Sequence, residues 1–452
     1  MLWFHGLVVL LGASLLVAGP ASAQSERATL IRNVTLVDGT GAPPLPGAHV
    51  LIAGERISMI ATSPITAPAG ATVIDGSGKY LIPGLIDSHV HVMGGRMVRP
   101  DGSLYVDRPF ALSRLQAYLY SGVTSVYDSG NNPDFIFGLR DEERAGKIKS
   151  PRIFATGGLV TAPGGYADSP TSIAIADFKA DMPKLLEQIK RKPDVQKMIY
   201  DRLGNFGTPM APVLELELFE KIVALFNQHG IPTTAHIFNE EDARVSLQAG
   251  INAFAHPIHA SATSEVLREL AIRRVPVSTT ITVYSHIAAV ADSPGFLDAP
   301  LFRATVEAKE LERQKTTERQ RYITSGMSER FKIMIPYMAK TVRQMHEAGV
   351  VLALGTDRTW GASVHMELEQ LAKAGIPLDD LVRIATLNGA VYLHREADLG
   401  SVERGKIADL VLLDADPTRS TAAYAKIHTV FKGGQVVDRG ALDLLPVNQK
   451  PR

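Results

Sequence analysis

Short apolar segments alternate with amphipathic helical segments through the middle of the chain. This alternation is typical of repeated βα units around a parallel sheet. The strands predicted from the pattern are LIDSHVHV (85–92), GVTSVYDS (122–129), RIFATGG (152–158), VQKMIYD (195–201), PTTAHIF (232–238), INAFAHP (251–257), VPVSTT (275–280) and VVLALGTD (350–357). Eight such units predict an α/β fold of the TIM (β/α)8 barrel type, whose chemistry lies at the C-terminal ends of the strands.

Two helices stand out between these strands. Residues 213–230 repeat apolar positions at spacings of three and four, and residues 240–250 follow Asn239, a residue suited to cap a helix. The interval 284–349 is too long for one loop and one helix, and it contains the charged stretch 306–322. We interpret the interval as an insertion after the seventh strand, either a solvated surface helix or a lid over the site.

The two ends of the chain have a different pattern, in which short apolar and polar residues alternate between Gly and Pro breaks. These are signals of sheet and hairpin turns. Neither end has enough strands to close a core, so we expect one small β-sandwich built from both. The predicted division is a signal peptide (1–23), a composite β-sandwich (24–82 plus 396–452) and the barrel (83–395).

The N-terminus carries an export signal. An apolar run precedes Ala21-Ser22-Ala23, which has the small-x-small pattern of a signal peptidase site before Gln24. We therefore expect a periplasmic or secreted protein that is free of the membrane after cleavage. The first residues, MLWFH, lack Lys and Arg, so an uncleaved anchor stays an alternative.

Composition limits the partners. The 452 residues are 45% apolar and 21% charged, which is ordinary for a globular protein. Lys plus Arg (47) balance Asp plus Glu (47) without a long charged run, so nothing favours nucleic acid or an anionic membrane surface. A small-molecule substrate is the expected partner, and homo-oligomer formation is left open. The absence of cysteine leaves His, Asp, Glu and modified Lys as metal ligands.

Titratable residues gather at the predicted strand ends. His89 and His91 lie two apart on the first strand and therefore share a face. The other strand ends contribute Lys197, His236, His256 and Asp357. Each alone also fits a structural role, such as a core histidine or a helix cap. Together, four imidazoles and a carboxylate favour Zn²⁺ or a related divalent ion.

Lys197 is the unusual member of this group. An ammonium has no lone pair, so the lysine is either a salt-bridge partner or, after reaction with carbon dioxide, a carbamate able to bridge two metals. Burial near dications would favour the neutral amine that this reaction needs. The group therefore predicts a site for two divalent metal ions.

Several motifs together resemble the amidohydrolase superfamily, most closely binuclear members similar to imidazolonepropionase and to prolidase-type amidohydrolases. They are PGLIDSHVHV (83–92), KPDVQKMIYD (192–201), TTAHIF (233–238), AFAHP (253–257), LALGTD (352–357) and LGSVERGKIADLVLLDADP (399–417). The resemblance implies that His89, His91 and Asp357 hold the more buried metal. It further implies that His236 and His256 hold a second metal, bridged to the first by carboxylated Lys197.

The expected chemistry is hydrolysis. Two dications that share a water molecule lower its pKa enough to supply hydroxide at neutral pH, and one also polarises the carbonyl. Asp357 would accept the proton and pass it to the leaving nitrogen. We expect a carbon–nitrogen bond as the target, in a dipeptide, an N-acyl amino acid or a cyclic amide. The alternatives are a lactone or phosphotriester substrate, a mononuclear deaminase, and a non-catalytic metal-binding relative.

Substrate contacts are harder to assign. Many prolidase-type relatives carry a histidine and a tyrosine where this chain has Tyr166 and Phe238, which weakens the dipeptidase interpretation. The candidates for substrate contact are Tyr166, Tyr200, Arg202 and Arg358. Tyr166 also fits a packing or surface role on its loop, and the last three also fit salt bridges at the rim of the barrel. Three further histidines are expected on loops facing the barrel mouth, where they would orient ligands or meet substrate: His259, His286 and His365.

Overall fold

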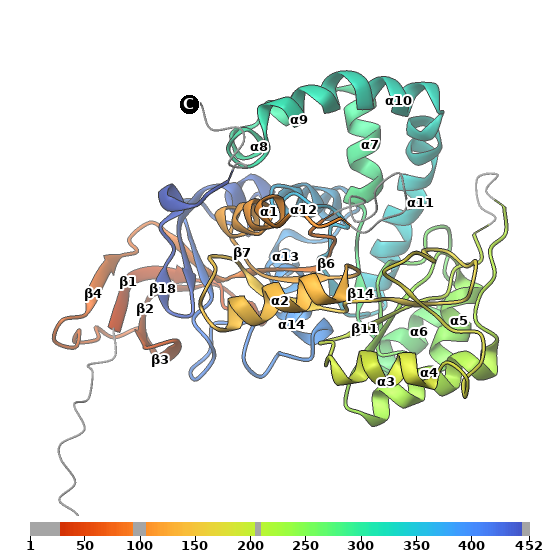
Figure 1. The fold of residues 1–452 in the computed structure, drawn as a ribbon. Helices are drawn as coiled ribbons and strands as arrows, with labels where there is room; N and C mark the ends of the chain where they lie inside the picture. Colours follow the sequence, from red (N-terminus) through yellow and green to blue (C-terminus); the bar gives the residue numbers. More distant parts are fainter. Residues whose placement is uncertain (1–27, 94–104, 204–208, 445–452) are drawn as a thin grey trace, which may run out of the picture.

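The computed structural model describes residues 28–93, 105–203 and 209–444, so the predicted signal peptide lies outside the described residues. Figure 1 shows a helix-covered barrel with a small sheet at one side and an arch of helices at another. None of the helices in the described ranges combines the length and apolar content needed to cross a membrane.

The small sheet joins the two ends of the chain. Its strands are β1 (Ala28–Leu36), β2 (Leu45–Ala53), β3 (Arg56–Ala61), β4 (Thr72–Asp75), β5 (Tyr80–Pro83), β16 (Leu410–Leu413), β17 (Ile427–Lys432) and β18 (Gln435–Val436). They run in the order β18-β17-β16-β5-β1-β2-β3, and β4 also pairs with β1. Strand β5 makes the junction, because it pairs with C-terminal β16 on one edge and N-terminal β1 on the other. Apolar side chains from both ends, including Ile31, Leu81 and Phe431, share one core. A small β domain built from both ends is confirmed.

The barrel is confirmed as well. Its strands are β6 (Leu85–Val90), β7 (Val123–Asp128), β8 (Arg152–Ala155), β11 (Gln196–Ile199), β12 (Thr233–His236), β13 (Ala253–Phe254), β14 (Val277–Ser278) and β15 (Leu352–Ala353), each inside a predicted segment. Within the two sheets they form, neighbouring barrel strands are parallel. Ser88 N donates to Leu354 O at 2.9 Å and links β6 to β15. Asp194 N donates to Ala155 O at 3.0 Å and links the segment before β11 to β8. Two short strands, β9 (Val160–Thr161) and β10 (Ile173–Ala174), lie in the loop after β8.

Helices cover the outside of the barrel. They are α1 (Arg108–Tyr120), α2 (Pro133–Arg144), α3 (Met182–Lys190), α4 (Leu216–Gln228), α5 (Glu240–Gln248), α6 (Ser264–Ile272), α12 (Ser363–Lys373), α13 (Leu378–Ala385) and α14 (Leu387–Tyr392). Helices α4 and α5 are the two that the sequence predicted. The Asn239 side chain accepts the N–H of Asp242 at 2.9 Å, so the predicted cap of α5 is confirmed.

The insertion after β14 is a series of helices joined by short non-helical links, and it forms the arch in Figure 1. It comprises α7 (Thr282–Asp292), a 3-10 turn (Pro294–Asp298), α8 (Pro300–Thr305), α9 (Ala308–Arg313), a π-helix (Gln314–Glu318), α10 (Arg319–Thr324) and α11 (Met327–Glu347). The arch has its own apolar cluster, in which Phe302 and Tyr322 pack with Trp360 from the barrel. Arg114 of α1 and Glu307 tie it to the barrel through an ion pair of 2.5 Å, and both side chains are almost fully buried.

Candidate metal centre

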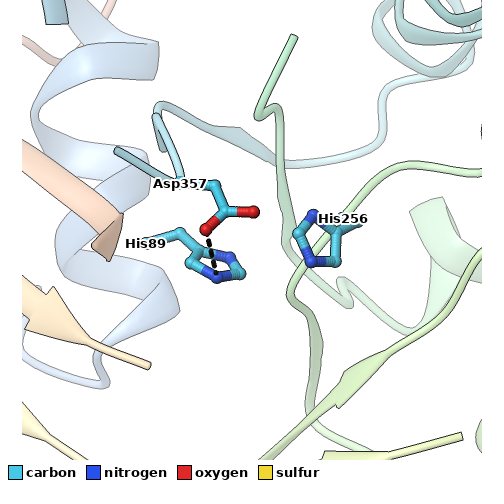
Figure 2. A group of neighbouring side chains, drawn as sticks. All are labelled: His89, His256 and Asp357. Carbon is cyan, nitrogen blue, oxygen red and sulfur yellow. Dashed lines mark ion pairs between the residues drawn. The ribbon is translucent and has the colours of Figure 1, made fainter. Parts of the chain in front are cut away.

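The six strand-end residues predicted as metal ligands come together at the mouth of the barrel. The ring centroid of His89 lies 4.6 Å from that of His256 and 5.4 Å from that of His91. The rings of His236 and His256 are 4.4 Å apart. Figure 2 shows His89, His256 and Asp357 facing a common space. They arrive from three different strand ends, as expected for a barrel.

The two remaining members lie beside His89. Its Nε2 is 3.1 Å from Nζ of Lys197 and 3.6 Å from Oδ1 of Asp357. The same carboxylate oxygen is 3.4 Å from Nε2 of His91. A lysine, an aspartate and imidazoles therefore share one small volume.

Hydrogen bonds determine which nitrogen of each histidine ring is free to face the candidate metal site. Nδ1–H of His89 donates to Ala255 O at 2.8 Å, and Nδ1–H of His91 donates to Gly130 O at 3.1 Å. Because a carbonyl oxygen only accepts, each Nδ1 carries the proton and each Nε2 keeps a lone pair for a metal. His236 is reversed: its Nε2 lies 3.2 Å from Asp201 Oδ2, which leaves Nδ1 as the free nitrogen.

One buried atom tests whether the site fits a metal. Nε2 of His256 is buried and has no hydrogen-bond partner among the described residues, while Nδ1 of the same ring lies 3.0 Å from Thr280 Oγ1. Leaving such an atom unsatisfied costs about 1–3 kcal/mol, and a cation would satisfy it. Donor atoms of His89, His256 and Asp357 lie within 4.8 Å of one another. The donor set and its spacing fit a divalent ion.

Burial adjusts the protonation of the group. It lowers the pKa of His89 and His256 well below the usual value, and it also lowers the pKa of His236. The rings are therefore neutral at pH 7, as metal binding requires. Burial lowers the pKa of Lys197 to about 8. At neutral pH a larger fraction of its amine is therefore uncharged than in a surface lysine.

A sharp backbone turn aims Asp357 at the rings. Its φ is +50°, a conformation that non-glycine residues rarely adopt. Asp357 N donates to His89 O at 2.8 Å, and Thr356 donates to the buried Asp87 carboxylate through N at 3.0 Å and Oγ1 at 2.7 Å. At Gly355 a Cβ would lie only 2.0 Å from Ser278 Oγ, so glycine is required there. Sequence analysis did not assign Asp87, although it stands two residues before His89.

Thr280 and Asp201 are further residues that hold the histidines in place. Both stand at the ends of predicted strands, and each meets one ring, Thr280 that of His256 and Asp201 that of His236. Sequence analysis names neither Asp201 nor Thr280 among its candidate residues. A hydroxyl at a strand end beside predicted ligands was the available signal for Thr280.

The predicted substrate contacts lie in different places. The Tyr166 ring is 4.9 Å from the His236 ring and 39% exposed. Tyr200 stacks on Phe219 of α4 at 4.8 Å, and Arg202 pairs with the buried Asp242 of α5. Their contacts hold Tyr200 and Arg202 against the covering helices, and their role in substrate binding stays a prediction.

The three further histidines only partly match their prediction. His259 lies on a loop, where its ring stacks on Phe238 and its Nε2 lies 2.9 Å from Tyr284 Oη. The prediction that His286 and His365 lie on loops is wrong, because α7 and α12 begin early enough to include them. His365 Nε2–H donates to Ser121 O at 3.0 Å, at the C-terminal end of α1.

A cavity of about 480 Å³ opens beside the candidate metal ligands. Its lining residues are His91, Met93, Phe110, Arg114, Glu310, Arg313, Gln314, Asp357, Arg358, Thr359 and Trp360. Three of them, Glu310, Arg313 and Gln314, belong to the insertion. The insertion is therefore a wall of this cavity and not only a solvated surface helix. Of the lining residues, sequence analysis named His91, Asp357 and Arg358 as site candidates, but it did not identify those contributed by α1 and the insertion.

Known proteins resemble most of the chain. The model of the amidohydrolase family matches residues 80–437. An imidazolonepropionase of Shouchella clausii is 39% identical over 110 residues, which are 22% of this chain and 24% of that protein, so this match spans about a quarter of its length. An imidazolonepropionase of Streptomyces griseus is 26% identical over 441 residues, 92% of this chain and 99% of that protein. The crystal structure of a Xaa-Pro dipeptidase with bound methionine aligns with a TM-score of 0.71 at 22% identity, over 91% of this chain and 99% of that one. At that identity the likeness is one of fold.

Proposed function

The chain belongs to the amidohydrolase family, and from this premise we propose that it is a metal-dependent hydrolase of carbon–nitrogen bonds in small molecules. Amides such as N-acyl amino acids, dipeptides and cyclic amides are the substrate class. The observation that carries the proposal is the position of Lys197, whose Nζ lies 3.1 Å from Nε2 of His89. Among the described residues, no carboxylate lies within ion-pair distance of this Nζ. A salt-bridge role for Lys197 is thereby disfavoured, and the carbamate is the better explanation.

The proposed centre holds two divalent ions, with Zn²⁺ as the expected metal. His89, His91 and Asp357 would hold one ion, and His236 and His256 the other. Nζ of Lys197 would attack the carbon of carbon dioxide, form an N–C bond and lose a proton, and the resulting carbamate would help to hold both ions. When bound, such ions polarise a carbonyl and lower the pKa of water.

The chain's own residues perform the proton transfers. Asp357 would take a proton from the attacking water and give it to the leaving nitrogen. Its backbone turn and the contacts to His89 and His91 hold the carboxylate where this transfer would occur. Asp201 and Thr280 would keep the second pair of rings in the orientation that binds metal.

The test combines a substrate screen with metal analysis of the same sample. The zinc-loaded protein is assayed against N-acyl amino acids, Xaa-Pro dipeptides, lactones and organophosphates. We expect about two zinc ions per chain and amide hydrolysis. The Lys197→Ala variant is expected to lose both the two-zinc content and the amide hydrolysis. Lys184→Ala, at an exposed lysine of α3, should keep the zinc content and the activity.

Three outcomes would overturn the assignment. Turnover by Lys197→Ala within a few-fold of wild type would remove the lysine from the centre. A metal content near one ion per chain, with full activity, would favour a mononuclear deaminase. Hydrolysis confined to lactones or phosphotriesters would replace the amide as the substrate class.

A further inference from the structure

The cavity beside the proposed metal centre contains one arginine, Arg358, that lacks an anionic partner among the residues that the structure describes. Of its three arginines, Arg114 is paired with Glu307 at 2.5 Å and Arg313 with Glu310 at 2.8 Å. Within the described parts of the chain, the guanidinium of Arg358 has no carboxylate at ion-pair distance and no side-chain hydrogen bond. Arg358 is half-buried. A guanidinium partly withdrawn from water without an anion is unfavourable, so the cavity is suited to receive one.

The rest of the cavity supplies apolar contact. Phe110 and Trp360 are nearly fully buried and line it together with Met93. Cζ of Arg358 lies 5.6 Å from the ring centroid of Trp360, which holds the guanidinium beside an aromatic face. One cation next to aromatic surface suits a ligand that carries both a negative charge and an apolar group.

The cavity lies directly beside residues of the proposed metal centre. His91 and Asp357, two of the proposed metal ligands, line it, and Arg358 directly follows Asp357 in the chain. Its volume of about 480 Å³ is within the usual range for small-molecule sites. The opposite wall includes Gln314, the first residue of the π-helix, a rare conformation that is frequent at functional sites.

We propose that this cavity is the substrate pocket, that Arg358 binds a carboxylate of the substrate, and that Phe110 and Trp360 contact its apolar side group. The proposal rests on the proposed function, because it takes His91 and Asp357 as the reacting end of the pocket. It narrows the substrate class to N-acyl derivatives of apolar amino acids. The planar fork of arginine suits a carboxylate, which it can bind with two parallel hydrogen bonds.

Trp360 allows the pocket to be tested without turnover. The chain contains two tryptophans, Trp3 and Trp360, so Trp3→Phe leaves Trp360 as the sole reporter of fluorescence. The zinc-loaded protein is mixed rapidly with N-acetyl-L-leucine or with its uncharged amide, N-acetyl-L-leucinamide, over a series of ligand concentrations, and Trp360 emission is read by stopped flow before the first turnover. We expect the carboxylate to bind about 10- to 100-fold more tightly, the range for hydrogen bonds to a charged group.

Variants identify the residue responsible. Arg358→Met should bind both ligands equally, and Arg358→Lys should retain part of the preference, because it keeps the charge without the fork. Arg303→Met is the matched control: this arginine of α8 is exposed, pairs with Asp298 and does not line the cavity. It should retain the full preference. Circular dichroism and thermal unfolding establish that each variant is folded.

Three binding results would contradict the proposal. Equal binding of the two ligands by wild type, a preference that survives Arg358→Met, or no saturable change in Trp360 emission would each overturn the proposal. A carboxylate bound by the metals alone would appear as a preference that survives in Arg358→Met. Because binding is read without hydrolysis, a protein that binds the carboxylate through Arg358 but cleaves no amide would overturn only the proposed function.

Discussion

The metal centre and the cavity beside it are adjacent but are held in place differently. The six residues of the centre stand at the ends of barrel strands, and backbone oxygens orient His89 and His91. The cavity is lined by α1, the insertion and residues 357–360 after β15, and side-chain ion pairs such as Arg114–Glu307 hold α1 and the insertion together. The barrel therefore positions the candidate metal ligands, whereas the separately packed arch forms part of the cavity that we propose binds substrate. Changes in the arch can alter selectivity and leave the metal ligands in place.

The largest expected effect comes from the metal centre itself. Asp357→Asn removes the group proposed to transfer the proton, and kcat on an N-acyl amino acid should fall by about 10²- to 10⁴-fold. Binding at the pocket, measured by Trp360 fluorescence, should persist, because Arg358 is unchanged. Asp379→Asn, at an exposed aspartate of α13, is the control and should retain full activity. A kcat within a few-fold of wild type would contradict the role of Asp357.

The next effect concerns the tie between the arch and the barrel. Glu307→Gln removes the carboxylate that pairs with the buried Arg114 guanidinium, and both side chains are at most 5% exposed in the wild type. Breaking such a pair should lower the free energy of unfolding by about 3–5 kcal/mol, measured with urea. Zinc content should stay the same, since no ligand is touched. Glu312→Gln, at an exposed residue of α9, is the control. If both variants unfold alike, the ion pair does not anchor the arch.

A smaller effect should follow from loosening one ligand. Thr280→Val removes the hydroxyl 3.0 Å from Nδ1 of His256 and keeps the branched Cβ at a residue whose φ is +38°. Zinc affinity, measured by competition with a chelator, should fall by about 10- to 100-fold. The binding of N-acetyl-L-leucine by Arg358 should change little. Thr324→Val on α10 serves as the exposed control. An unchanged zinc affinity would exclude Thr280 from the support of the centre.

The smallest effect tests a residue outside both regions. Burial lowers the pKa of His365 to about 4 from 6.5. The unfolded chain therefore binds a proton below pH 6.5 that the folded chain does not, so this contribution to stability is complete above pH 6.5 and is lost as the pH falls towards about 4. His365→Gln should flatten the fall of unfolding free energy between pH 6.5 and 5, by at most about 1.4 kcal/mol per pH unit. An unchanged slope in urea unfolding would show that His365 is not responsible.

The sequence predicted most of the barrel and the convergence of the six strand-end residues. Each barrel strand lies within its predicted segment, because short apolar runs between helical segments identify parallel strands directly. The ends of such strands meet at one edge, so His89, His236 and Asp357 could be placed together although they are far apart in the chain. The sequence pattern did not predict where α7 and α12 begin. For that reason it predicts His286 and His365 on loops, whereas both lie in helices.

Periodicity and strand-end chemistry by themselves determined the barrel, the small β domain and the set of candidate ligands. The tertiary structure alone decided that the insertion forms a cavity wall, that Tyr200 and Arg202 contact the covering helices, and that Arg358 has no carboxylate at ion-pair distance among the described residues. These outcomes depend on contacts such as that between Arg114 and Glu307, which are 193 residues apart. Neither the secondary-structure propensity of a segment nor its hydrophobic periodicity predicts such contacts. They arise only when the folded chain brings distant side chains together and removes them from water.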